Sequence, residues 1–423
     1  MQSAAQIESL IAKARAETAS GKLDSAAAAW ADVERAAPSH AEAALNLARI
    51  ALKRGRGSEA IAKFLRAENL ASKEAIIPLE RAAAHRLVGD SEGEIDALEK
   101  ALAIDPYCYP ALLFKGGWLE RQQRPHDAAR IYTDAFRILP ETIPAGLQPV
   151  VAHARETLDQ SRRALDAFLK ERLAATRARF ASERLDRFDE CAEAAIGFKK
   201  IYVHQPTLLH FPRLPAIQYH DDDLFPWMRE LEAASDDMTS ELAALIEEDA
   251  PGFIPYVRMR PGDPVNQWAE LNHSPKWSAF FFYENGARNE ENCRRCPKTA
   301  AALAKVPMAL TPGYSPNAFF STLAPGGHIP AHTGSTNVRL IGHLPLIDPG
   351  QCSFRVGNET RDWTRGKAWV FDDTIEHEAW NRSDRLRVIL IFDVWNPLLS
   401  QGEREMVSAF LAARREFYAQ AEA

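Results

Sequence analysis

The first third of the chain repeats with a period of 34 residues, and this period constrains the fold more than any other feature. One phase of the repeat holds turn residues: Gly21, Gly55, Gly89 and Gln123. Another holds the break between repeats: Pro38, Ser72, Pro106 and Pro140. Two more phases hold a large and a smaller apolar side chain: Trp30, Phe64, Leu98 and Tyr132, then Val33, Ala67, Ala101 and Ala135. A period shared by several phases indicates stacked units that bury a continuous core.

Each repeat reads as a helix, a turn, a second helix and a break. The small residues Ala26, Ala60 and Ala128 let paired helices approach, with Glu94 as the exception in that phase. The large side chain then fills the groove between the helices. The pattern resembles the tetratricopeptide repeat. We therefore expect residues 1–140 to form a tetratricopeptide-like α-solenoid.

The rest of the chain divides into three parts. Residues 141–190 stay rich in Arg, Glu and Ala, which predicts a helical extension or cap, with a polar end to the solenoid, and a linker. Residues 191–400 contain short apolar runs separated by turn residues, which indicates a β sandwich or barrel. The predicted strands are Trp277–Tyr283, Ala318–Leu323, Val338–Leu346, Cys352–Val356, Lys367–Phe371 and Leu386–Val394. Residues 401–423 are expected to form a closing helix, at about Glu403–Ala421.

Composition narrows the cellular setting. The net charge of −7 gives no electrostatic reason to expect nucleic acid or an anionic membrane as a partner. No apolar run reaches the length of a membrane-spanning helix. The N-terminal segment reads as an amphipathic helix with Glu8 and Lys13, and it lacks the features of a signal peptide. Five sparse cysteines fit a reducing compartment, so we expect a cytoplasmic protein.

Two histidines and an arginine carry the chemistry of the second half. His377 lies 45 residues after His332, and Arg387 lies ten residues after His377. Imidazoles on neighbouring strands of a small barrel can hold one first-row metal with open coordination positions. A lone arginine on the next strand can grip a dicarboxylate beside that metal, because its burial is costly without an anion. This layout is typical of a non-haem iron oxygenase that consumes 2-oxoglutarate.

The segment from Ser321 to Pro397 resembles the aspartyl/asparaginyl β-hydroxylase family. The similar text is HIPAHTGSTNVRLIGHLPL, GKAWVFDDTIEHEAWN and LRVILIFDVWNP, with WSAFFFYENGARNEENCRRCPKT upstream. The resemblance implies a double-stranded β-helix (jelly-roll) domain that uses Fe(II), 2-oxoglutarate and O2. It also implies hydroxylation of an aspartyl or asparaginyl carbon in a protein or peptide, with succinate and CO2 as coproducts. The whole chain is then an α + β multidomain dioxygenase.

The same resemblance implies the residues of the site. His332 and His377 would be the iron ligands. Ser321, His343 and Arg387 would bind 2-oxoglutarate, and Trp277 would line the pocket. No further catalytic side chain is implied.

Three positions leave alternatives open. Gly334 stands where the usual facial triad has a carboxylate, and the family also lacks that ligand. We expect water there, with Asp372 or Asp373 as an alternative ligand. Arg339 could face the substrate or pair with Asp372. Animal family members carry a basic residue at the position of Ile341, so this apolar residue puts the substrate in doubt.

Two other readings of the function remain. The same chemistry could act on a free amino acid, a small peptide or another small molecule. The chain could instead be a non-catalytic scaffold. The repeats fit each reading, since they can recruit a protein or peptide substrate or hold the enzyme in an assembly. Among minor features, Cys293 and Cys296 read as reduced loop thiols, with a redox pair as the alternative. The run from Asp221 to Asp223 reads as a solvated loop.

Overall fold

The computed structural model describes residues 4–247 and 252–420, which divide into two compact units. The first unit is Met1–Phe198 and the second is Lys199–Ala423. Residues 1–3 of the predicted N-terminal helix and 421–423 of the predicted C-terminal helix lie outside the described residues. The two units are taken in turn.

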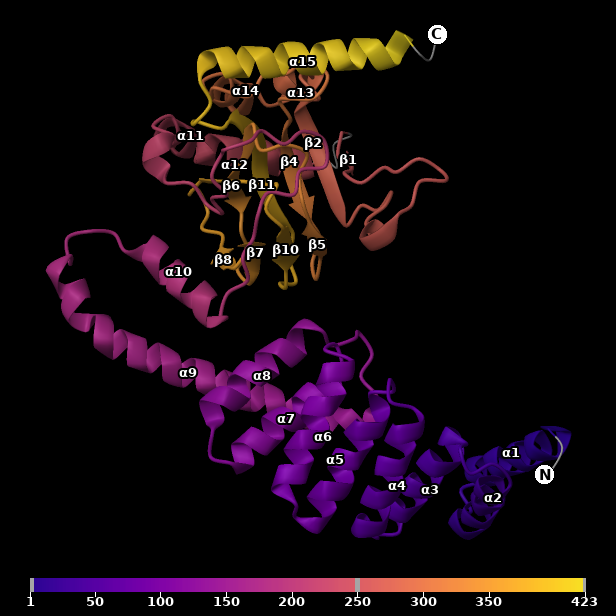
Figure 1. Ribbon diagram of the computed structural model, residues 1–423. Helices are drawn as coiled ribbons and strands as arrows, with labels where there is room; N and C mark the ends of the chain where they lie inside the picture. The colour runs from indigo at the N-terminus through magenta and orange to yellow at the C-terminus, as the bar shows by residue number, and fades with distance from the viewer. Residues whose placement is uncertain (1–3, 248–251, 421–423) are drawn as a thin grey trace. The chain divides into compact units, whose positions relative to one another are not determined.

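The first unit is built from consecutive helix pairs (Figure 1). The helices that open the pairs are α1 (Ala4–Ala19), α3 (Ala41–Lys53), α5 (Ile76–Val88) and α7 (Tyr109–Arg121). Their partners are α2 (Leu23–Ala36), α4 (Gly57–Leu70), α6 (Ser91–Ile104) and α8 (Pro125–Arg137). The partner helices begin 34 residues apart, which confirms the helical repeat expected from the sequence.

Each phase of the repeat has a physical role in these helix pairs. The large apolar side chain of each repeat is at most 1% exposed; these side chains are Trp30, Phe64, Leu98 and Tyr132. The turn phase takes a left-handed backbone, with φ of 71° at Gly21, 74° at Gly55, 76° at Gly89 and 57° at Gln123. Glycine adopts this conformation without steric cost, whereas Gln123 does so against its preference. The exceptional Glu94 is buried and forms an ion pair with Arg121 at 2.6 Å.

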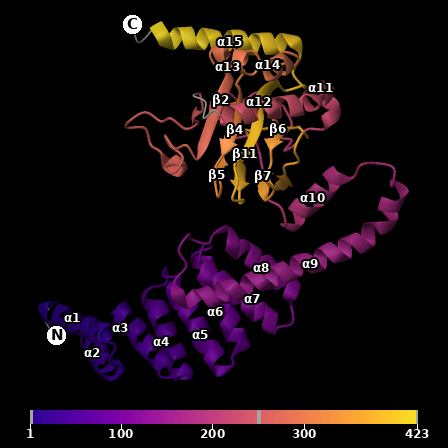
Figure 2. The same ribbon diagram turned by 180° about the vertical axis from the view of Figure 1, so that it is seen from behind.

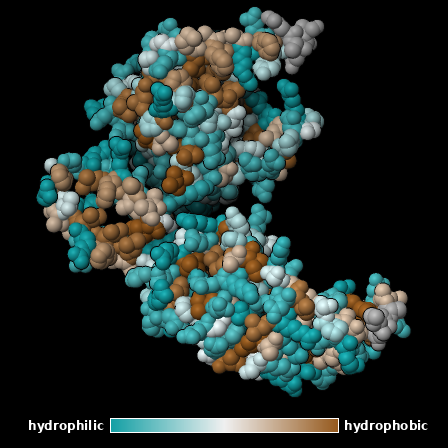
Figure 3. Space-filling view, in the orientation of Figure 1, coloured by the Kyte–Doolittle hydropathy of each residue, from teal (hydrophilic) through white to brown (hydrophobic). Residues whose placement is uncertain are grey.

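The solenoid continues into two further helices. A short 3-10 turn, η1 (Ala145–Leu147), leads into α9 (Gln148–Arg179), and α10 (Asp186–Ile196) follows. A polar end was expected here, but this part exposes large apolar side chains, and Figure 3 shows apolar residues gathered on it. They include Leu165 (46% exposed), Phe168 (52%) and Phe188 (47%). The segment is helical, as expected, and its surface carries large apolar side chains as well as polar ones.

The second unit contains two antiparallel sheets (Figures 1 and 2). The larger sheet has the order β1-β2-β4-β11-β6-β9, with β3 paired to β2, and the smaller has the order β5-β10-β7-β8. The larger sheet is formed by β1 (Ile254–Pro255), β2 (Trp277–Glu284), β3 (Ala287–Arg288), β4 (Ala318–Leu323), β6 (Arg339–Ile347), β9 (Trp369–Phe371) and β11 (Arg387–Trp395). The smaller sheet is formed by β5 (His328–His332), β7 (Cys352–Val356), β8 (Glu359–Asp362) and β10 (His377–Asn381). This two-sheet architecture is the one expected for a double-stranded β-helix.

Alternation along β11 shows how the larger sheet divides its side chains between two cores. Val388, Leu390 and Phe392 join an apolar cluster with residues of the helices outside the sheet. Arg387 and Ile389 instead line a cavity, together with residues of the smaller sheet. Because both faces of the strand are covered, the sequence there is almost continuously apolar.

Helices cover the outer side of the larger sheet. They are α11 (Met228–Ala233), α12 (Ser235–Glu247), α13 (Glu290–Arg295) and α14 (Pro297–Leu303). The closing helix α15 (Gln401–Gln420) packs Val407 and Leu411 against Val338 and Leu399. Two 3-10 turns, η2 (Asp222–Leu224) and η3 (Asn266–Trp268), complete the unit. None of the helices in the described part of the chain is long and apolar enough to span a bilayer.

Two details differ from the expectations. Cys293 lies within α13 and Cys296 caps α14, so these thiols are not in a loop. Both are buried, and burial raises the pKa of Cys293 and raises that of Cys296 to about 12. High thiol pKa values oppose thiolate reactivity. The acidic residues 221–223 are exposed as expected, in and before the short turn η2.

Candidate active site

A cavity of about 420 Å³ lies between the two sheets of the second unit. Its lining brings together every site residue predicted from the sequence: Trp277, Ser321, His332, His343, His377 and Arg387. These residues come from strands of both sheets, so the fold gathers positions that span more than 100 residues of chain.

The two histidines face each other across paired strands. His332 ends β5, His377 begins β10, and the two are register partners with ring centroids 4.0 Å apart. The Nδ1 atom of His332 lies 2.8 Å from the carbonyl oxygen of Pro330, and that of His377 lies 3.0 Å from the carbonyl oxygen of Ile375. A ring that donates from Nδ1 to a carbonyl presents Nε2 as its free lone pair. Both rings are thus held in the form that a metal ligand requires.

The surroundings keep both rings neutral. Burial lowers the pKa of His332, with the carbonyl of Pro330 opposing the change. Burial and the neighbouring His332 hold the pKa of His377 well below its usual value. Since only a neutral imidazole can coordinate a metal, the pair is ready to bind one near neutral pH.

Close packing explains why residue 334 is a glycine, which the sequence alone did not reveal. A Cβ atom at this position would lie 1.9 Å from Oδ2 of Asp373, so the Asp373 carboxylate occupies the space of a side chain at 334. The main chain is close as well, since the amide of Gly334 donates to the carbonyl of Asp373 at 2.6 Å. A carboxylate ligand on residue 334 is therefore sterically excluded by Asp373.

The two neighbouring aspartates have different surroundings. Asp373 lines the cavity, and its Oδ1 has no hydrogen-bond partner among the described residues. Burial raises the pKa of its carboxyl to about 7, with Arg339 opposing. Asp372 instead accepts hydrogen bonds from Thr374 and contacts His204 at 3.1 Å, outside the cavity lining. The described residues contain no group of three or more His, Cys, Asp or Glu side chains arranged as a metal site.

Arg387 is a buried cation without a counter-ion. It is 1% exposed, and its recorded protein contacts are a 3.4 Å hydrogen bond to the carbonyl of Ser321 and the ring of Trp363. Its Nε has no partner, and no carboxylate pairs with it among the residues that the structure describes. Burial lowers its pKa to about 10, which still leaves it charged. An unpaired buried charge is strongly destabilising, so this position is built to receive an anion.

The neighbours of Arg387 are suited to the same anion. The indole N–H of Trp277 donates to Oγ of Ser321 at 3.0 Å, which leaves the Ser321 hydroxyl proton free to donate elsewhere. His343 is 4% exposed and its Nδ1 has no partner. Burial and the charge of Arg387 hold the pKa of His343 well below its usual value. A neutral imidazole and a hydroxyl add directional donors without adding charge.

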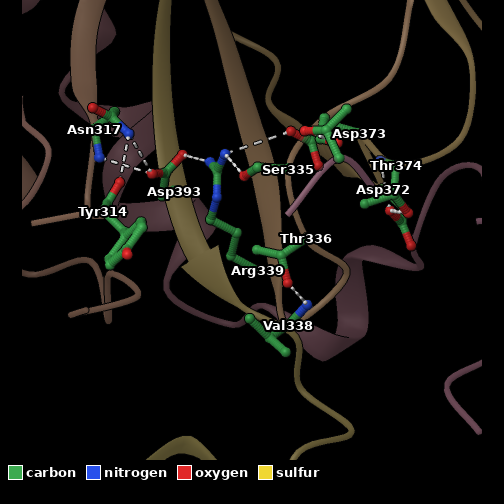
Figure 4. A network of polar contacts seen from close by, with 12 residues as sticks. Tyr314, Asn317, Ser335, Thr336, Val338, Arg339, Asp372, Asp373, Thr374 and Asp393 are labelled. Carbon is green, nitrogen blue, oxygen red and sulfur yellow. Dashed lines mark hydrogen bonds and ion pairs between the residues drawn. The ribbon is translucent and has the colours of Figure 1, made fainter. Parts of the chain in front are cut away.

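Arg339 sits in a polar network on the other side of the cavity (Figure 4). Its guanidinium donates to Asp393 and to Oγ of Ser335, and it lies 3.7 Å from Oδ2 of Asp373. Asn317 donates to Asp393 from its main-chain and side-chain nitrogens. Arg339 thus faces the cavity but is paired with Asp393 and Asp373, so the alternative of pairing with Asp372 is wrong.

The comparisons with known proteins agree with this geometry. Residues 232–397 match the profile of the Aspartyl/Asparaginyl beta-hydroxylase family. A Rhizobium tropici protein named ornithine lipid ester-linked acyl 2-hydroxylase is 34% identical over 197 residues, which cover 45% of this chain and 65% of that protein. Human aspartyl/asparaginyl beta-hydroxylase is 40% identical over 141 residues, which cover 33% of this chain and 18% of that protein.

Residues 232–397 of the second unit are thus similar to the aspartyl/asparaginyl β-hydroxylase family. The match spans less than two thirds of the length of either relative. Among solved structures, the MamA protein matches at 20% identity over 41% of this chain and 94% of its own, with a TM-score of 0.33. A tetratricopeptide repeat protein from Parabacteroides merdae covers 39% at 22% identity, with a TM-score of 0.32.

Sequence reasoning missed several residues of the second unit that line the cavity. They are chiefly Tyr256, Trp268, Phe319, Trp363, Asp393 and Ile391. Alternation could have found some of them, because residues two apart share a face of a strand, as Ile391 and Asp393 do with Arg387 on β11. Trp268 and Trp363 lie outside strands, where no periodicity indicates which way a side chain faces. The apolar members make the wall beside the histidines largely hydrophobic.

Proposed function

We propose that the hydroxylase domain is an Fe(II)- and 2-oxoglutarate-dependent dioxygenase that hydroxylates a carbon of its substrate. The observation that carries the proposal is Arg387, a buried cation without a counter-ion among the described residues, in the same cavity as a paired, neutral His332 and His377. The donor set fits both partners, since imidazole suits iron(II) and a guanidinium fork suits a carboxylate.

Each side chain has a role in this proposal. His332 and His377 hold the iron through Nε2, and their Nδ1 contacts with main-chain carbonyls fix the ring orientations. Arg387 binds the distal carboxylate of 2-oxoglutarate, and Ser321 and His343 donate to the same molecule. When bound, iron and 2-oxoglutarate supply the activation of O2, with succinate and CO2 as coproducts. Asp373 offers its unpartnered oxygen as an acceptor for water beside Gly334.

The favoured substrate is an aspartyl or asparaginyl residue in a protein or peptide that the repeats recruit. This follows the name of the human relative, and hydroxylation would fall on the β-carbon. In this proposal the protein works in a reducing cytoplasm, without a nucleic acid or membrane partner.

A second candidate keeps the chemistry and changes the substrate to an uncharged or largely apolar small molecule. One observation favours it: among the described residues, the cavity wall offers no free cation for an acidic substrate besides Arg387, which the proposal assigns to 2-oxoglutarate. Arg339 is neutralised by Asp393 and Asp373, and the nearby Ile341 is apolar. A substrate carboxylate there would meet two aspartates, which costs free energy through like-charge repulsion. The Rhizobium relative is named for acting on an acyl group.

The test measures succinate formed from 2-oxoglutarate by the full chain with Fe(II) and ascorbate. We expect the wild type to turn over, Arg387→Ala to lose nearly all 2-oxoglutarate binding, and Arg387→Lys to recover part of it. The exposed Arg385 is the matched control, because it lies two residues away on the same segment, and Arg385→Ala should behave as wild type. If the wild-type protein neither bound 2-oxoglutarate nor formed succinate, the dioxygenase proposal would fail, and a non-catalytic scaffold would be the remaining interpretation. Addition of one oxygen to matched aspartyl, asparaginyl and acyl substrates then separates the two candidates.

A further inference from the structure

Three buried side-chain nitrogen atoms of residues that line the cavity have no hydrogen-bond partner among the described residues. They are Nε of Arg387, Nδ1 of His343 and Nε1 of Trp363. Buried polar groups are almost always bonded, and a lost partner costs more free energy than a bond contributes. The nitrogens of Arg387 and Trp363 can only donate, so together they indicate a shared ligand that accepts hydrogen bonds. Arg387 and His343 already have roles in the proposed function, whereas Trp363 has none.

Trp363 is held firmly beside the arginine. It follows β8, is 4% exposed, and packs against Phe354 and Trp369 with ring centroids 5.5 and 5.9 Å away. The guanidinium carbon of Arg387 lies 4.8 Å from the centroid of its ring. An aromatic face attracts and orients a guanidinium without neutralising it. Arg387 therefore keeps its charge and its in-plane donors for an incoming carboxylate.

Trp369, which stacks on Trp363, is a useful comparison because it packs in the core without lining the cavity. It is 7% exposed and its Nε1 also lacks a partner, but it lies outside the cavity lining. No cation is recorded over its ring among the described residues. The two indoles therefore share burial, stacking and an unsatisfied N–H, and they differ in access to the cavity and to Arg387.

We propose that Trp363 is a binding residue of the dicarboxylate site, where its indole N–H donates to bound 2-oxoglutarate while its ring face orients Arg387. The proposal rests on the proposed function and adds to it one directional donor beside Arg387. Removal of the N–H with retention of the aromatic face is thus the informative change.

The experiment uses the full chain loaded with Fe(II) and titrated with 2-oxoglutarate without oxygen. Trp363→Phe keeps a ring over Arg387 and removes the N–H, and we expect 2-oxoglutarate affinity to fall about ten-fold or more. Trp369→Phe removes an equally unsatisfied N–H outside the cavity, so its affinity should stay close to that of the wild type. Iron affinity should be unchanged in both variants, which separates loss of a ligand contact from a general disturbance of the site.

Two results would overturn the inference. One is equal 2-oxoglutarate affinity in Trp363→Phe and wild type. The other is read in wild-type protein labelled at the indole nitrogens and loaded with Zn(II): the indole signal that is missing in Trp363→Phe belongs to Trp363 and should shift on addition of 2-oxoglutarate, and an unshifted signal counts against the inference. Failure of the wild type to bind 2-oxoglutarate at all would instead remove the proposed function.

Discussion

Three histidines near the cavity differ in what their rings can do. His332 and His377 are neutral and turn Nε2 away from the main chain, whereas His328, on the same strand as His332, is half exposed and contacts Glu378 at 3.2 Å. Position on the strand alone does not make a ligand. The ring also needs burial and a carbonyl partner that leaves one nitrogen free.

The first prediction follows from that difference. His332→Ala and His377→Ala should each abolish stoichiometric Fe(II) binding, because each variant removes one of the two proposed imidazole ligands. His328→Ala should bind Fe(II) as the wild type does. Calorimetric titration of the metal-free proteins checks this, and full iron occupancy in either of the first two variants would show that the ligands lie elsewhere.

A second prediction concerns Asp373 and pH. Its folded-state pKa of about 7 lies above the value of about 3.9 for an unfolded chain. The folded protein therefore holds a proton that the unfolded chain has released, and stability falls as pH rises from about 4 to about 7. Asp373→Asn should stabilise metal-free protein at pH 8, by an amount on the order of a few kcal/mol, and have little effect near pH 4.

Denaturant unfolding at the two pH values measures this difference. Asp384→Asn is the control, since Asp384 is exposed and its substitution should change stability little at either pH. A stability gain from Asp373→Asn that is the same at both pH values would contradict the role of ionisation. A residue kept at a cost in stability is typical of functional sites.

At the scale of elements, the loop between β9 and β10 packs against the residue two positions after His332. The close approach of Gly334 and Asp373 couples the end of β5 to that loop. We predict that Gly334→Ala destabilises the domain by about 1–3 kcal/mol, because the added methyl must displace a buried carboxylate. Gly402→Ala should be neutral or slightly stabilising, since a Cβ there meets no atom within 4 Å and the residue lies in α15.

Unfolding free energies of the two glycine variants provide the measurement. Equal effects of the two substitutions would mean that Asp373 moves aside freely. Iron affinity of Gly334→Ala should fall as well, because the displaced carboxylate lies in the same cavity as the histidines.

Element by element, the sequence predicted the strands that are buried on both faces. The six predicted runs correspond to β2, β4, β6, β7, β9 and β11, with ends within two residues. It missed β1, β3, β5, β8 and β10, and His332 was expected at the end of a turn. These strands are short, β8 is wholly polar, and β5 contains Pro330, which is a weak strand signal.

The candidate site was also predicted only in part from the sequence. Residues carried by the family motif all line the cavity, whereas the pairing of Arg339 with Asp393 arises from the register of β6 with β11, where Trp395 is opposite Arg339. Register is set by the whole sheet and is not written in any local pattern. The position of Trp363 depends on a turn, and no pattern in the sequence predicted it either.

At the scale of the whole molecule, the chain boundary between the units falls at Phe198 and Lys199. Every lining residue of the cavity comes after that point. We predict that a chain beginning at Lys199 binds Fe(II) and 2-oxoglutarate as the full chain does and forms succinate slowly without substrate. Hydroxylation of a protein or peptide substrate should fall, because binding remote from the reacting carbon positions it.

Succinate formation and oxygen incorporation in both chains check this prediction. If a genuine peptide substrate were hydroxylated equally fast with and without the repeats, substrate recruitment would be excluded as the role of the repeats. That result would leave assembly, for which the exposed apolar side chains of α9 and α10 offer a surface.

The pairing of His332 with His377 has a consequence for the lifetime of the protein. β5 is an edge strand that, among the described strands, pairs only with β10, and the register slips just past His377. A metal ion bound by both rings would cross-link β5 to β10 beside the irregularity in their register. Without iron, β5 would therefore separate from the sheet before the other strands. A loosened edge exposes unpaired main-chain groups to proteases and to strands of other chains. Iron supply would then govern how long the enzyme survives as well as how fast it works.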